Sequence, residues 1–160
     1  MRDINTDPHE PEIGGSLNEQ RGADEQENVT KTGTTTIGIA VDDGVAIVTD
    51  RKASLGGRFT VSKDVVKVQQ IHPTGAITLV GSVGGAQDFA ARLETECSLY
   101  QSRRGEEISM HALANVAGNF ARRGPFMRIN PILGGLDEDG SHVYTIDPAG
   151  GVMEEDNYTV

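Results

Sequence analysis

Three consecutive threonines follow Gly33, where a polar leader gives way to β-branched and apolar residues. Cleavage of the Gly33–Thr34 peptide bond would leave the Thr34 hydroxyl beside a free α-amine. The unperturbed pKa of such an amine is about 8, which suits a general base for that hydroxyl at neutral pH. Threonine is equally ordinary at the start of a strand. The residues alone therefore leave a nucleophile and a plain strand residue both open.

Two charged residues interrupt the predicted strands that follow. Asp50 ends the second strand, and Lys67 lies within an apolar stretch of the third. Each alone is typical of a solvated charge at a strand end. If the two meet near Thr34, the Lys67 ammonium lowers the cost of removing the hydroxyl proton, and the Asp50 carboxylate holds that ammonium in place.

A glycine-rich segment, GSVGGAQ at residues 81–87, leads from a predicted strand into a predicted helix. Unpaired backbone N–H groups at such a helix start can stabilise an oxyanion, although a tight, closely packed turn needs the same residues. The single cysteine, Cys97, lies on the apolar side of that helix, which indicates an unreactive core thiol. One cysteine and four scattered histidines match no zinc pattern, so we expect no metal and no cofactor.

The segments TTTIGIAV and VAIVTD, joined by DDG, predict a β-hairpin. A three-residue loop with Gly44 in the left-handed conformation is a common closure. That register would place Asp50 opposite Thr36, on the same face as Thr34, whereas a two-residue turn would reverse the face. We expect the three-residue loop.

The remaining chain predicts a second strand pair, two helices and three short strands. The strands are expected within residues 62–71, 76–83, 129–135, 141–147 and 151–156. Apolar residues at spacings of three and four predict one helix from Gly84 to Gly105 and another from the cap Ser109 to Gly124. This order favours a layered α+β domain with both helices on one face.

Composition and charge limit the partners and the compartment. Of 160 residues, 14 are Lys or Arg and 24 are Asp or Glu, so the net charge is −10 and no basic patch for nucleic acid stands out. No apolar run approaches the roughly 20 residues of a membrane helix, and no secretory signal opens the chain. We therefore expect a cytoplasmic protein that binds neither nucleic acid nor membrane.

The motifs together resemble a known family. TGTTTIGIAVDDGVAIVTDRKAS, GSVGGAQ, LYQSRRGEEISMHALANVAGN, PILGG and YTIDPAGG resemble, in this order, an archaeal, haloarchaeal-like proteasome β subunit of the N-terminal-nucleophile hydrolase superfamily. The resemblance implies a four-layer αββα sandwich, here apparently truncated at the C-terminus. It also implies two stacked seven-membered β rings with fourteen copies, flanking α-subunit rings, a regulatory ATPase, and threonine-type endopeptidase activity on unfolded protein chains.

The same resemblance assigns roles to individual residues. Residues 1–33 would be a disordered propeptide that is removed by autocleavage, and residues 34–160 would be an incomplete N-terminal-nucleophile hydrolase domain. Thr34 would be the nucleophile freed by cleavage after Gly33, with Asp50 and Lys67 as its catalytic partners. The backbone N–H of Gly81 would form the oxyanion hole.

The family's specificity pocket falls on four apolar residues beside the substrate-binding Ser54, namely Ala53, Val65, Leu79 and Val83. A pocket without a charged wall favours cleavage after large hydrophobic residues, because an ionic side chain would lose its hydration without gaining a partner. The resemblance thus predicts a chymotrypsin-like preference.

Three other functions remain open on the sequence. The chain could be a ring subunit that assembles but is inactive, because it is unprocessed or truncated. It could belong with the related bacterial two-ring peptidase that works with an ATPase, which also starts its mature chains with Thr-Thr. It could also be a binding module without chemistry, if Thr34, Asp50 and Lys67 are all unremarkable strand residues.

The acidic composition generates a prediction about salt. A dense carboxylate surface stays hydrated when salt screens its self-repulsion, so we expect dialysis from molar salt into dilute buffer to lower the unfolding temperature. Thermal unfolding followed by circular dichroism at both salt concentrations measures this. An unchanged unfolding temperature would show that the surface is not adapted to salt.

Overall fold

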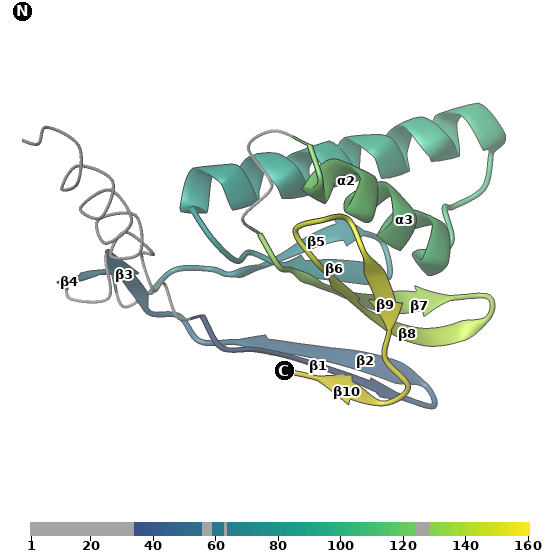
Figure 1. Ribbon diagram of the computed structural model, residues 1–160. Coiled ribbons are helices and arrows are strands. Elements are labelled where there is room, and N and C mark those ends of the chain that lie inside the picture. The colour runs from purple at the N-terminus through teal and green to yellow at the C-terminus, as the bar shows by residue number, and fades with distance from the viewer. Residues whose placement is uncertain (1–33, 56–58, 63, 124–128) are drawn as a thin grey trace, which may run out of the picture. The chain divides into compact units, whose positions relative to one another are not determined.

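The computed structural model describes residues 34–55, 59–62, 64–123 and 129–160 (Figure 1). All of them belong to one unit, Thr32–Val160. The predicted propeptide 1–33, including Gly33, lies outside the described residues, as does the Gly124–Pro125 pair.

Ten strands and two helices make up the described part of the chain. In chain order they are β1 Thr36–Val41, β2 Gly44–Thr49, β3 Ala53–Leu55, β4 Phe59–Ser62, β5 Val68–His72, β6 Gly75–Thr78, α2 Val83–Arg104, α3 Met110–Ala121, β7 Ile132–Asp137, β8 Gly140–Ile146, β9 Val152–Glu154 and β10 Tyr158–Thr159. They form an antiparallel five-stranded sheet in the order β5-β6-β7-β8-β9, a three-stranded sheet β10-β1-β2, and a two-stranded ribbon β3-β4.

The elements stack in layers. Figure 1 shows α2 and α3 covering one face of the five-stranded sheet, while the β10-β1-β2 sheet lies against the other face. Apolar side chains of the helices and of the five-stranded sheet form the main core, among them Phe89, Leu93, Leu113, Leu133 and Ile146. The α+β class, with both helices on one face, is therefore confirmed.

Glycines allow the two sheets to approach closely. A Cβ atom on Gly134 of β7 would lie 2.8 Å from a methyl group of Val45, and one on Gly38 of β1 would lie 2.8 Å from a methyl group of Ile132. These distances are shorter than any real Cβ contact, so only glycine fits at both positions. The close contact holds the β1–β2 hairpin, whose far end carries the candidate site, on the five-stranded sheet.

Both helices follow the local signals in the sequence. The Ser82 hydroxyl accepts the Gly85 N–H (3.3 Å) at the start of α2, and Gly105 ends the helix at a φ of 75°. The Ser109 hydroxyl accepts the Ala112 N–H (3.3 Å) at the start of α3. The predicted apolar stripes are the buried faces, with Tyr100 and Phe120 partly buried at their margins.

The predicted hairpin loop is wrong. Val41 pairs with Gly44 and Thr36 with Thr49, so the turn has two residues, and Gly44 does not have a positive φ. This register turns Val45 and Ile47 toward Gly134 in the neighbouring sheet and leaves Val48 54% exposed. A shift of one residue in the pairing would exchange the side chains on the inner and outer faces of β2. The contact between the sheets therefore selects the two-residue turn.

The second strand pair is shorter than predicted, and one ribbon was not predicted. β5 begins only at Val68 and β6 ends at Thr78, so residues 64–67 and 79–83 are not strands. The β3–β4 ribbon arises from ASLGGRFTVS at residues 53–62, in which the alternating segments ASL and FTVS are only three and four residues long and give a weak strand signal. In the part of the chain that the structure describes, neither helix has the length and apolar character needed to cross a membrane.

Two helical glycines give a matched prediction on packing. A Cβ atom at Gly118 in α3 would lie 2.7 Å from the Gly150 carbonyl oxygen and from a methyl group of Val152, whereas one at Gly84 in α2 meets nothing within 4 Å. Gly118→Ala should therefore lower the free energy of unfolding by about 1–3 kcal/mol through overpacking. Gly84→Ala should raise it by about 0.5 kcal/mol, because alanine reduces the freedom of the unfolded chain. Chemical denaturation of both variants in high salt tests this pair, and equal effects would contradict it.

Candidate active site

An ion pair between a buried lysine and a half-buried aspartate lies where three strand ends meet. Lys67 is 7% exposed, and its Nζ atom lies 3.0 Å from both carboxylate oxygens of Asp50. The same ammonium donates to the Lys52 carbonyl oxygen at 2.6 Å. An ammonium has three hydrogens to donate, and three acceptor oxygens surround this one. The lysine charge is thus compensated inside the protein.

Both oxygens of the Asp50 carboxylate accept hydrogen bonds from main-chain N–H groups. Its Oδ1 accepts the Thr35 N–H at 3.2 Å, and its Oδ2 accepts the Lys52 N–H at 3.1 Å. Burial acts to raise the pKa of Asp50, but the hydrogen bonds from Lys67, Thr35 and Lys52 outweigh it and hold the pKa below 3.8. The carboxylate is therefore ionised at neutral pH and keeps the ammonium in one position.

Strand pairing brings these residues together. Asp50 comes directly after β2 and Thr35 directly before β1, and the Asp50 N–H donates to the Thr35 carbonyl oxygen at 3.2 Å. Lys67 directly precedes β5, and its carbonyl oxygen accepts the Leu79 N–H at 2.6 Å. The Val65 N–H donates to the Arg51 carbonyl oxygen at 3.0 Å. The segment 64–67 is thus anchored between the end of β2 and the residue after β6.

Thr34 is next to this network along the chain. It is half-buried, two residues before β1, and its neighbour Thr35 is hydrogen-bonded to Asp50. Asp50 lies opposite Thr35 rather than Thr36, which corrects the predicted pairing. The structure therefore joins Asp50 and Lys67 directly. Thr34 is connected to this pair through its chain neighbour Thr35.

Gly81 lies in the connection from β6 to α2. Its φ is 101°, in the left-handed region that favours glycine, and the next residue is the helix cap Ser82. The turn therefore demands glycine for its backbone conformation, as the structural interpretation of GSVGGAQ predicted. The first N–H groups of a helix lack partners within it, so the same connection can also offer donors to an anion. Its role as an oxyanion hole stays a prediction.

The predicted specificity residues lie at or near these strand ends. Val65 and Leu79 are half-buried, and Leu79 packs against the main core. Val83, the first residue of α2, is 53% exposed. Ala53 and Ser54 belong to β3, and their side chains lie outside the described residues. Cys97 is buried, and burial raises its pKa to about 11, which fits a core thiol.

Sequence reasoning missed the main-chain partners of the ion pair. The Lys52 carbonyl and the N–H groups of Thr35 and Lys52 complete the shell around Asp50 and Lys67. Main-chain groups are the same in every residue except proline, so no residue type could signal them.

Comparison with known proteins identifies the family. The model of the family described as "Proteasome subunit" matches residues 30–160. The chain belongs to the proteasome subunit family. The match includes Thr34, Asp50, Lys67 and Gly81, which makes these positions part of the proteasome subunit domain.

Similar proteins come from haloarchaea and are β subunits. The chain is 64% identical over 155 residues to "Proteasome subunit beta 2" of Haloarcula marismortui, which covers 97% of this chain and 66% of that protein. It is 65% identical over 153 residues to "Proteasome subunit beta" of Natrialba magadii, covering 96% and 63%. It is 61% identical over 160 residues to "Proteasome subunit beta" of Halomicrobium mukohataei, covering 100% and 67%. The chain thus spans about two thirds of these relatives.

The ion pair predicts how stability depends on pH. Because the folded state holds the pKa of Asp50 below 3.8, its stabilising effect is present above pH 3.8 and is lost as the pH falls through the folded-state pKa. Asp50→Asn should lower the free energy of unfolding by about 1–3 kcal/mol at neutral pH, and the difference should shrink toward pH 3. Denaturation of the full gene product from pH 7 to 3 measures it. Asp156→Asn, at an exposed carboxylate, is the control, and a pH-independent difference would contradict the prediction.

Proposed function

We propose that the full-length protein is a threonine-type endopeptidase subunit of a proteasome core particle, with Thr34 as its nucleophile. The observation that carries this proposal is the buried Lys67 ammonium, which is fixed by Asp50. Asp50 in turn accepts the N–H of Thr35, the residue that follows Thr34. A compensated charge buried at strand ends contributes little to stability compared with apolar packing. Its position beside a Gly-Thr junction favours a catalytic role.

The proposed reaction begins with cleavage of the Gly33–Thr34 bond, which frees the Thr34 amine. That amine takes the proton of the Thr34 hydroxyl, and the oxygen attacks the carbonyl carbon of the peptide substrate. The Lys67 ammonium stabilises the developing negative charge on the attacking oxygen, while Asp50 orients the ammonium. The Gly81 N–H stabilises the tetrahedral oxyanion. The C–N bond then breaks, the leaving amine takes the proton, and water hydrolyses the resulting ester.

The substrates would be unfolded protein chains, cut after large hydrophobic residues. Val65, Leu79, Val83 and Ala53 are all apolar, and Ser54 lies on the adjoining strand β3. An apolar pocket gains from burying Leu, Tyr or Phe and gives no partner to a charged side chain.

The complete protein would form a four-layer αββα sandwich. The outer face of the β10-β1-β2 sheet exposes large apolar side chains, namely Ile39, Val41, Val48 and Tyr158, which are 39 to 68% exposed. A second pair of helices would cover this face in the full-length protein. Two stacked seven-membered β rings between α-subunit rings, served by a regulatory ATPase, would then confine the active threonines inside a barrel.

Replacement of the nucleophile tests self-cleavage. In the full gene product assembled with its ring partners in high salt, Thr34→Ala should keep residues 1–33 and show no peptide hydrolysis, because no hydroxyl can attack. Thr34→Ser, which keeps a hydroxyl, should be processed and retain activity. Intact mass and N-terminal sequencing measure the processing. Normal removal of the leader from Thr34→Ala would refute self-cleavage, and an unprocessed but assembled wild type would favour the inactive ring subunit.

Short reporter peptides test the substrate preference. The assembled particle should cleave after Leu, Tyr or Phe at least tenfold faster than after Arg or Glu, a difference of about 1.4 kcal/mol in transition-state binding. Val65→Glu should reduce the preference for Leu, Tyr or Phe over Arg, because it adds a carboxylate to the apolar wall of the pocket. Faster cleavage after Arg or Glu by the wild type would overturn the preference.

A further inference from the structure

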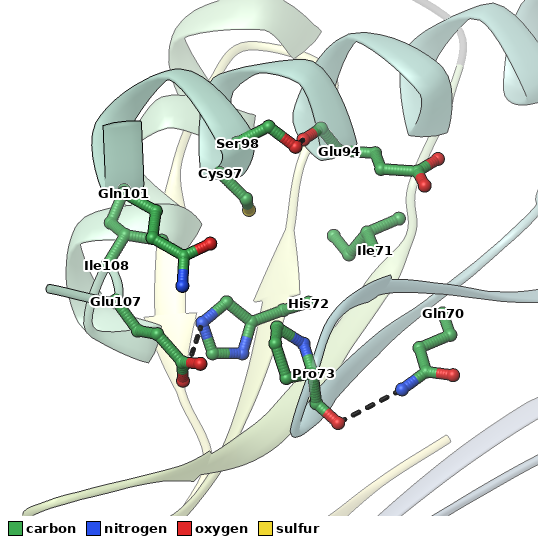
Figure 2. A pocket seen from close by; sticks show the side chains of 10 residues that line it. All are labelled: Gln70, Ile71, His72, Pro73, Glu94, Cys97, Ser98, Gln101, Glu107 and Ile108. Carbon is green, nitrogen blue, oxygen red and sulfur yellow. Dashed lines mark hydrogen bonds and ion pairs between the residues drawn. The ribbon is translucent and has the colours of Figure 1, made fainter. Parts of the chain in front are cut away.

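His72 and His142 both face carboxylates, but their surroundings differ. His72 lines a polar pocket beside α2, where Figure 2 shows its ring facing Glu107. The Thr74 N–H donates to His72 Nδ1 at 3.3 Å, so the ring proton is on Nε2, 3.7 Å from the Glu107 carboxylate. Burial lowers the pKa of His72, although Glu107 and Asp137 act in the opposite direction. His72 is therefore an uncharged part of the pocket wall at neutral pH.

His142, on β8, lies between two carboxylates instead of one. Its Nδ1 atom is 2.6 Å from a Glu154 oxygen on β9, and its Nε2 atom is 3.0 Å from Asp137 Oδ1 on β7. A carboxylate accepts hydrogen bonds and donates none, so both ring nitrogens must carry a proton for both bonds to form. The geometry therefore requires the charged imidazolium, which joins three neighbouring strands.

The surroundings of His142 favour that charge. Burial acts to lower its pKa, but the hydrogen bond to Glu154 and the charge of Asp137 outweigh it and raise the pKa above 6.5. The Tyr144 ring is stacked on the imidazole with 5.9 Å between the centroids, and an aromatic face attracts a cation. Burial raises the pKa of Tyr144, so this phenol stays neutral while His142 titrates.

The other titratable groups around this cluster come from the β7–β8 turn and from α3. In the turn, Asp139 follows Glu138 and donates its N–H to Asp137 Oδ1 at 3.0 Å. His111 of α3 lies edge-on to Tyr144, with 6.2 Å between the ring centroids. The carboxylates that bond directly to the His142 ring are those of Asp137 and Glu154, so these two control its protonation.

Asp137 is the more firmly held of the two carboxylates. Its Oδ2 atom accepts the N–H of Met110, the first residue of α3, at 2.7 Å. Burial acts to raise the pKa of Asp137, but the N–H groups of Met110 and Asp139, together with His142, hold it below 3.8. Asp137 thus stays ionised and fixed at the start of the helix.

Loss of one proton from His142 removes one of its two bonds, because a neutral imidazole has a single N–H. The side chain of Asp137 is 11% exposed and that of Glu154 is 50% exposed, so Glu154 is the carboxylate that can turn into water. The remaining proton therefore stays on Nε2 beside Asp137. The bond that breaks is the one to β9.

Strand β9 depends on that bond more than the central strands would. It has three residues, Val152–Glu154, and forms the edge of the five-stranded sheet beside β8. A short strand at an edge opens more readily than a central strand. We propose that His142 is a protonation-dependent clamp, which fastens β9 to the sheet when the ring is charged and releases it when the ring is neutral.

Hydrogen exchange followed by mass spectrometry tests the clamp in the full-length protein, assembled with its ring partners in high salt. Because the folded state raises the pKa of His142, the stabilisation of β9 is complete below pH 6.5 and is lost as the pH rises through the folded-state pKa. After correction for intrinsic exchange rates, protection of β9 should fall by about threefold or more from pH 6 to pH 9. Protection of α2 should stay constant.

Three variants separate the clamp from a merely structural contact. His142→Gln has no charge to lose, so protection of β9 should be low at both pH values. Glu154→Gln should keep β9 protected at both pH values, because an amide accepts from the charged ring and donates to the neutral one. His111→Gln, at an exposed histidine beside the same Tyr144, should show the same fall as the wild type.

Several results would overturn the inference. They are equal protection of β9 at pH 6 and pH 9 in the wild type, a fall of wild-type size in Glu154→Gln, or an equal loss of protection in α2, which would indicate general unfolding. Hydrolysis of short peptides by the same particles reports on Thr34 separately. A pH-dependent β9 in a particle without peptidase activity would sustain the clamp and refute the proposed function.

Discussion

The buried ammonium of Lys67 is the constraint on which the arrangement of the candidate site depends. A lysine charge removed from water is costly unless acceptors surround it, so Asp50 and the Lys52 carbonyl must be in place when the domain folds. These acceptors come from the chain after β2, while Lys67 itself precedes β5. Satisfying one charge therefore ties together the ends of two sheets.

Close packing between the sheets provides the rigid support for that charge. Gly38 and Gly134 have no side chains, and Val45, Ile47 and Ile132 fill the space above them. The hairpin of β1 and β2 is thereby held in one register on the five-stranded sheet. Since Thr35 and Asp50 are the residues at the open end of that hairpin, the packing of apolar groups at its middle determines where the polar groups meet.

Helices were predictable because their signals are local. The cap Ser109, the terminating Gly105 and the apolar spacing in each helix act within a few residues, and the structure has each of them in the predicted place. The start of α2 was predicted at Gly84, one residue late, because its cap Ser82 was not singled out. The hairpin loop was mispredicted because DDG is compatible with two turns. The choice between them depends on Gly134, some ninety residues later, and the neighbouring sequence carries no sign of it.

The sequence by itself determined the residue types of the candidate site, the two helices, the α+β class and the resemblance to proteasome β subunits, because these follow from local patterns and ordered motifs. Only the tertiary structure decided that Lys67 binds Asp50 and that main-chain groups of Thr35 and Lys52 complete the shell. It alone revealed that His142 lies between Asp137 and Glu154. The physical reason is that burial and hydrogen-bond geometry arise from segments far apart in the chain, and a side chain's partners are not written in its own neighbourhood.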